Sequence, residues 1–212
     1  SKIFEPHVTE YAGTSVTEWK KSSPINLECG RAKVVLDAIR ILKEKNLDVP
    51  IIGNLVGPVS VASSVIDPVG FYKDLRRHKE EAHQFMTFVT EQLIAFANAM
   101  IENGADVIAI SDPSGTGEIL GPKFFEEYAV KYLNMLLDGI KDQEKGTIVH
   151  ICGQMRSVYE QIDKVHSDAL SFDAIVPLKE ARKNLQDRVL MGNVSTFAFC
   201  LLYTSPSPRD TR

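Results

Sequence analysis

The segment GTIVHICG, residues 146–153, carries two metal-ligand residue types close together. His150 and Cys152 stand at the end of an apolar run, 147–151, that we expect to form a buried strand. Because side chains alternate along a strand, positions i and i+2 face the same side. An imidazole and a thiolate on one face offer half of a tetrahedral zinc site, and Gly153 leaves room beside them. An isolated pair also fits a core histidine beside an inert buried cysteine. Further ligands would have to come from elsewhere in the fold.

The bulk composition is that of a soluble globular protein with a large core. The chain has 212 residues, of which 44% are hydrophobic and 25% charged, with a net charge of −4. Lys and Arg are spread along helical faces, so nucleic acid is not expected as a partner. No apolar run approaches the ~20 residues of a membrane span, and no signal-peptide pattern opens the chain. Three scattered cysteines, Cys29, Cys152 and Cys200, form no disulfide framework, which predicts a cytoplasmic location.

Apolar runs and helical periodicity alternate along the chain after an irregular arm, residues 1–27. Five short apolar runs predict strands within 49–55, 105–110, 147–151, 169–172 and 188–191. Apolar residues at helical spacing, with Gly and Pro at the ends, predict helices over 31–45, from 57, from 67, and over 79–103, 121–138, 154–165 and 178–185. Repeated βα units imply a parallel sheet, as a doubly wound open sheet or a (β/α)8 barrel.

Polar residues at the carboxyl ends of the predicted strands decide between these two α/β folds. They follow all five strands, and they are Asn54, Asp112, the His150/Cys152 pair, Asp173 and Asn193. TIM-barrel enzymes build their active sites on that face, from several strands at once. No strand is followed by Gly-x-Gly-x-x-Gly or by a phosphate-binding Gly-Lys-Ser/Thr loop. We therefore predict an incomplete (β/α)8 TIM barrel with about five of its eight βα units.

The last residues do not continue this pattern. After Thr196 the register breaks, and CLLYTSPSPRD, residues 200–210, back-translates to a common sequencing adapter. We expect a partial barrel domain over 1–199 and a non-native tail over 200–212. Cys200 would then not be a zinc ligand, although its position suggests one. A whole barrel needs ~250 residues, and the chain starts without Met, so we expect a fragment that lacks strands at both ends.

Several motifs together resemble the uroporphyrinogen decarboxylase superfamily, and within it the corrinoid-dependent methyltransferases that move a methyl group from methylcobalamin to a thiol such as coenzyme M. The resemblance runs from about residue 24 to 196. The motifs are VPIIGN (49–54) with GP (57–58), GADVI (104–108), DPS (112–114), GPKFFEE (121–127), HICG (150–153), SFD (171–173) and GNVS (192–195).

The resemblance implies zinc, methylcobalamin on a corrinoid protein, and a small thiol substrate. Such methyltransferases bind zinc through His-x-Cys and a distant third cysteine, and His150 and Cys152 match the first two. The third would follow the eighth strand, outside this chain. Asp112 and Glu118 would orient His150 or add a labile ligand, or else they serve loop and helix-cap chemistry.

Further residues and alternatives remain open at this point. Asn54, Asp112, Glu118, Asp173 and Asn193 would bind substrate at the barrel mouth, or else end strands and cap helices. The run KDLRRHKEE, residues 73–81, is typical of a solvated helix face, and a docking corrinoid protein would use such a surface.

Two other functions compete with methyl transfer. The decarboxylase branch shares the fold and the Gly-Asn-Val element, 192–194, but it carries no His-x-Cys at this strand. Under this alternative, the protein would act as a metal-free decarboxylase of a tetrapyrrole. A third alternative is a barrel that binds a small ligand without catalysis. His150 and Cys152 favour the methyltransferase. We expect the fragment itself to be inactive, because an open barrel exposes apolar strand edges and lacks a ligand.

Overall fold

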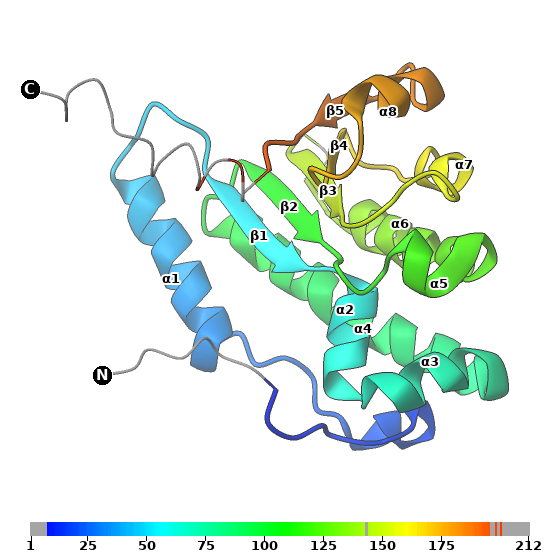
Figure 1. The fold of residues 1–212 in the computed structure, drawn as a ribbon. Coiled ribbons are helices and arrows are strands. Elements are labelled where there is room, and N and C mark those ends of the chain that lie inside the picture. Colours follow the sequence, from blue (N-terminus) through cyan, green and yellow to red (C-terminus); the bar gives the residue numbers. More distant parts are fainter. Residues whose placement is uncertain (1–7, 143, 196–197, 199, 201–212) are drawn as a thin grey trace, which may run out of the picture.

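The computed structural model describes residues 8–142, 144–195, 198 and 200. Its centre is one five-stranded parallel sheet in the order β1-β2-β3-β4-β5 (Figure 1). The strands are β1 (Ile52–Val56), β2 (Val107–Ser111), β3 (Gly146–Ile151), β4 (Ala169–Phe172) and β5 (Val189–Met191). Because each strand lies beside the next one in the chain, the sheet has the sequential order of a barrel section rather than the switched order of a doubly wound sheet.

Helices lie between consecutive strands along the chain, as they do in repeated βα units. Before β1 come η1 (Val16–Lys21) and α1 (Gly30–Glu44), and between β1 and β2 come α2 (Pro58–Val65), α3 (Pro68–Arg77) and α4 (Lys79–Glu102). The later connections hold α5 (Gly117–Phe124), the π-helical η2 (Phe125–Val130), α6 (Lys131–Asp138), α7 (Tyr159–Ile162) and α8 (Leu178–Asn184). Among the described residues, no helix is both long and apolar enough to cross a membrane.

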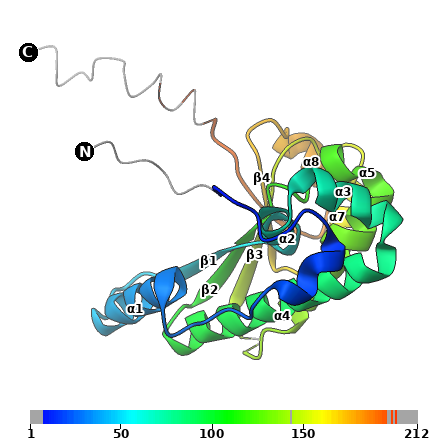
Figure 2. The same cartoon turned by 90° about the horizontal axis from the view of Figure 1, so that it is seen from below.

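The two faces of the sheet have different surroundings. Alternate residues such as Leu55, Ile108 and Val149 are at most 4% exposed. These residues point to the outer face, where a Cβ on Gly53 would meet Met100 of α4. The opposite, inner face is open, and Ile52 and other apolar side chains there are about half exposed. In a closed barrel this inner face is filled by side chains from the remaining strands, so its exposure is that of a partial barrel (Figure 2).

Some predicted boundaries differ from the structure. β1 extends to Val56, so Asn54 lies inside the strand and not after its end. The helix predicted over 154–165 is reduced to α7, because Met155 and Val158 bury their side chains from a loop and not from a helix. The helix predicted from residue 121 agrees with the structure, because Gly121 has a non-helical φ of +68 and a helical segment starts after it at Pro122. The helical turn before Gly121, whose first residue is Gly117 and which the Thr116 side chain caps, was not predicted. The arm, predicted as irregular, contains the 3-10 helix η1.

Asp106 joins the starts of the first two strands, and its loss should cost stability in a pH-dependent way. Its carboxylate accepts hydrogen bonds from the Ile51 backbone N–H at 3.0 Å and from Lys43 Nζ at 3.1 Å. The Ile51 bond first, and then Lys43, lower the Asp106 pKa below its ordinary 3.8. A lowered folded-state pKa adds stability above pH 3.8, and this is lost as the pH falls through the folded-state value.

We therefore expect Asp106→Asn in the complete protein to lower the urea midpoint at neutral pH, with a deficit that shrinks as the pH falls below 3.8. Urea titrations at a series of pH values measure this. Asp48→Asn is the matched control, because Asp48 is exposed. A deficit of equal size at every pH would contradict the assignment.

Candidate functional site

His150 lies near the carboxyl end of β3 and faces the inner side of the sheet. Its register partners are Ser111 of β2 and Ser171 of β4. The imidazole Nδ1 lies 3.0 Å from the Ser171 hydroxyl oxygen. This hydrogen bond orients the ring and leaves Nε2 available as a ligand atom.

Cys152 follows directly after β3, and its thiol is half-buried. Burial raises the pKa of this thiol, and the carboxylates of Asp173 and Asp112 raise it further. The negative charges that disfavour a bare thiolate favour a cation at the same place. A bound metal ion would take the place of the thiol proton, so the surroundings of Cys152 fit a soft divalent cation.

The described residues supply part of a metal site and not a whole one. No group of three His, Cys, Asp or Glu residues among them is placed to hold a metal ion. His150 and Cys152 therefore offer two donors, which suit zinc in type. Cys200 is exposed and belongs to no such group within the described part of the chain.

Asp112 is only 1% exposed and is tied to the start of α2. Its two carboxylate oxygens accept hydrogen bonds from the Val59 N–H at 3.1 Å, the Ser60 N–H at 2.8 Å and the Ser60 hydroxyl at 2.6 Å. The Asp112 pKa is raised above its ordinary value, because the effect of burial exceeds the opposite effect of these hydrogen bonds. The contacts favour the helix-cap role of Asp112 over contact with a substrate.

Glu118 holds the loop that carries Cys152. Its Oε2 accepts a hydrogen bond from the Gln154 N–H at 3.0 Å. Gly153 has φ +76, and a Cβ added there would collide with the same Glu118 oxygen. Because φ is positive, a residue with a side chain would be strained at this position, so glycine is favoured there. Glu118 thus supports the Cys152 loop, which agrees with the alternative that Asp112 and Glu118 serve loop and helix-cap chemistry. The side chain hydrogen-bonded to His150 is that of Ser171.

Asp173 and Asn193 join the loops after β4 and β5. Asn193 Nδ2 donates to the backbone oxygens of Asp173, at 2.9 Å, and Val176. The Asp173 carboxylate accepts from the Ile175 N–H at 3.3 Å. These contacts shape the loops beyond the strand ends. Asn54, by contrast, is exposed on the inner face of β1, in register with Ala109 of β2.

Ser171 and Ser60 have roles that the sequence analysis did not find. Ser171 could have been noticed as a polar residue inside the apolar strand 169–172, two positions before Asp173. Strand pairing places it opposite His150. Ser60, in the first turn of the helix after Gly57-Pro58, contacts both Asp112 and the Ser114 N–H, the latter at 2.8 Å. The contacts of Ser171 and Ser60 do not follow from local sequence, because they join residues of different βα units.

This chain is similar in sequence to known proteins. The family model described as uroporphyrinogen decarboxylase (URO-D) matches residues 2–208. Methylcobamide:CoM methyltransferase MtbA of Methanosarcina acetivorans is 33% identical over 195 residues, covering 92% of this chain and 57% of that protein. MtaA of Methanosarcina barkeri, a methyltransferase of the same description, is 36% identical, covering 87% and 53%. Uroporphyrinogen decarboxylase of Nitrosomonas europaea is 28% identical, covering 82% and 51%.

A solved structure supports the same relationship. A methyltransferase from Methanosarcina mazei superposes with a TM-score of 0.82 at 32% identity, covering 92% of this chain and 58% of that one. The chain spans about half the length of the curated relatives it matches. The predictions of an incomplete barrel and of the family resemblance are confirmed.

Proposed function

The chain belongs to the uroporphyrinogen decarboxylase (URO-D) family, and on that premise we propose that the complete protein transfers a methyl group from methylcobalamin, carried on a corrinoid protein, to the thiol of coenzyme M. The observation that carries the proposal is the position of His150, on the inner face near the end of β3, with Cys152 directly after the strand. The methyltransferases named above are more similar to this chain than the named decarboxylase is, which supports the same conclusion.

We propose that His150 Nε2 and Cys152 Sγ hold a zinc ion together with a third ligand from outside the described residues. Zinc, when bound, would lower the pKa of the substrate thiol so that the thiolate is present at neutral pH. Methylcobalamin would supply the methyl group: the thiolate sulfur would bond to the methyl carbon as the carbon–cobalt bond breaks, with its electron pair left on cobalt.

The chain's own residues would prepare this step by positioning. Ser171 orients the His150 ring through Nδ1, and Glu118 fixes the backbone next to Cys152. Asn54 is the proposed substrate contact on the inner face, while Asp173 and Asn193 shape the mouth. Preorganised ligands reduce the entropy lost when metal and substrate are brought together.

Two further expectations remain proposals. A cytoplasmic location suits the free Cys29, Cys152 and Cys200. Residues 200–212 are proposed to be non-native, and all of them except Cys200 lie outside the described residues.

The test needs the complete protein, obtained by reading the gene beyond both ends of this chain without adapter sequence. We expect purified protein to contain zinc and to methylate coenzyme M from free methylcobalamin, with activity lost on chelation and restored by zinc. Release of carbon dioxide from uroporphyrinogen, without zinc dependence and without thiol methylation, would instead support the decarboxylase alternative.

A further inference from the structure

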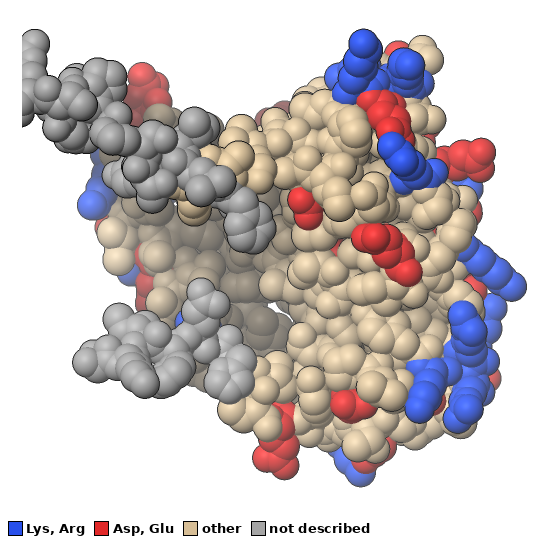
Figure 3. Space-filling view, viewed as in Figure 1, with Lys and Arg blue, Asp and Glu red and all other residues tan. Residues whose placement is uncertain are grey.

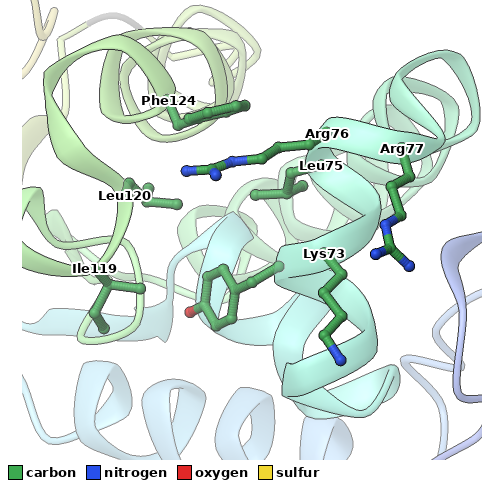
Figure 4. A pocket seen from close by; sticks show the side chains of 8 residues that line it. Lys73, Leu75, Arg76, Arg77, Ile119, Leu120 and Phe124 are labelled. Carbon is green, nitrogen blue, oxygen red and sulfur yellow. The ribbon is translucent and has the colours of Figure 1, made fainter.

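A pocket of about 370 Å³ opens between α3 and α5. Its α3 side carries Tyr72, Lys73, Leu75, Arg76 and Arg77, and its α5 side carries the apolar Ile119, Leu120 and Phe124 (Figure 4). The Arg76 guanidinium reaches across from α3 and lies 5.0 Å from the centroid of the Phe124 ring. The pocket therefore combines three cations with an apolar and aromatic wall.

The three cations have no carboxylate partner among the described residues, whereas many other surface cations do. Lys79, just beyond α3, is paired with Glu127 at 2.6 Å, and Arg156 with Glu180 at 3.0 Å. The acidic residue within α3, Asp74, is buried and accepts hydrogen bonds from Ser15 and Val16. Figure 3 shows basic side chains gathered at the edge of the molecule where α3 lies. A locally positive pocket on a chain of net charge −4 is suited to an acidic partner.

The pocket lies on the same side of the molecule as the His150/Cys152 pair. Both views of the fold place α3 and α5 beyond the carboxyl ends of the strands (Figures 1 and 2). The helix α5 belongs to both regions, because Glu118 holds the Cys152 loop while the next two residues line the pocket. Tyr72 donates to the Ser114 oxygen at 2.9 Å, which joins α3 to the loop after β2.

We propose that this α3–α5 pocket is the docking site of the corrinoid protein, through an acidic surface segment that carries an apolar side chain. Carboxylates would pair with Lys73, Arg76 and Arg77, and the apolar side chain would pack on Ile119 and Phe124. Ile119 is 53% exposed and has room for such a contact. Because the pocket lies beyond the carboxyl ends of the strands, a protein seated on it would also cover the side of the barrel section that holds the His150/Cys152 pair. The proposal rests on the proposed function, because it names the protein that delivers the methyl group.

Binding and catalysis are measured separately on the complete protein. The binding probe is the corrinoid protein encoded in the same genome as this chain, loaded with hydroxocobalamin and titrated at low and high salt. We expect Lys73→Glu/Arg76→Glu/Arg77→Glu to raise the Kd about tenfold or more at low salt. The effect should shrink in 1 M salt, where the Debye length is about 3 Å. The rate with free methylcobalamin should stay unchanged, because the pocket does not touch the reacting atoms.

Two other variants control for charge and for folding. Lys73→Glu/Arg77→Glu leaves the Arg76 contact with Phe124 intact and should show part of the effect. The matched control reverses three exposed cations near the amino ends of the strands, on the opposite side, and should leave the Kd unchanged: Lys45, Lys141 and Lys183.

The outcomes separate this proposal from the proposed function. No binding by the wild type, or equal Kd values for wild type and triple variant, would overturn the docking site while leaving methyl transfer from free methylcobalamin intact. Binding that depends on the pocket, without any thiol methylation, would support docking and overturn the proposed function. If inorganic pyrophosphate binds in a pocket-dependent way and the corrinoid protein does not, the pocket is a small-anion site and the docking proposal is wrong.

Discussion

Cys152→Ser in the complete protein should remove most of the bound zinc and lower the rate of coenzyme M methylation by more than about a hundredfold. Serine keeps the size of the side chain, but its hydroxyl does not ionise near neutral pH and is a poor ligand for zinc. No group of three His, Cys, Asp or Glu side chains among the described residues is placed to hold a metal ion, so no described donor set replaces the lost thiolate. Zinc content by elemental analysis and the rate with free methylcobalamin measure the effect.

Two further variants make this result specific. Cys29→Ser should change neither quantity, because Cys29 is exposed at the start of α1. Ser171→Ala removes the hydrogen bond to His150 Nδ1 and should weaken zinc binding by about 10- to 100-fold, the usual cost of losing a residue that orients a ligand. If Cys152→Ser kept its zinc and its rate, the His150/Cys152 pair would be core residues and the methyltransferase proposal would lose its main support.

Tyr128→Ala should lower the free energy of unfolding by about 3–5 kcal/mol, as large-to-small changes of buried aromatic residues do. The Tyr128 side chain is fully buried, and its ring stacks on His83 at 4.7 Å and on Phe124 at 5.9 Å between centroids. Its hydroxyl donates to the Leu75 oxygen at 3.0 Å, in the last turn of α3, where helix carbonyls lack partners within the helix. Urea unfolding of the complete protein measures the loss.

Comparison with Tyr128→Phe separates packing from hydrogen bonding. The phenylalanine variant keeps the ring and loses only the bond to Leu75, so it should cost about 1 kcal/mol. Tyr11→Ala, at an exposed tyrosine, should have little effect. Equal losses for Tyr128→Phe and Tyr128→Ala would mean that the hydroxyl, and not the ring, stabilises α3 and the pocket wall.

The parts of the fold that follow from local periodicity could be predicted. The helix over 79–103 and the strand over 147–151 agree with α4 and β3 to within about a residue at most ends, because amphipathic spacing is written in consecutive residues. The barrel itself followed from the alternation of strands and helices and from polar residues at strand ends. The helix predicted over 154–165 was mostly wrong, since buried residues at helical spacing also fit a loop packed on the core.

For the candidate site, the sequence alone determined that His150 and Cys152 occur together at the end of a strand, because alternation within one strand is a local property. Only the tertiary structure decided what surrounds them. Strand register brought Ser171 to His150, loop packing brought Glu118 to the Cys152 loop, and the start of α2 engaged Asp112. These contacts join residues 21, 36 and 52 positions apart in the chain. Such pairs are selected by the free energy of the whole packed barrel and not by any local preference.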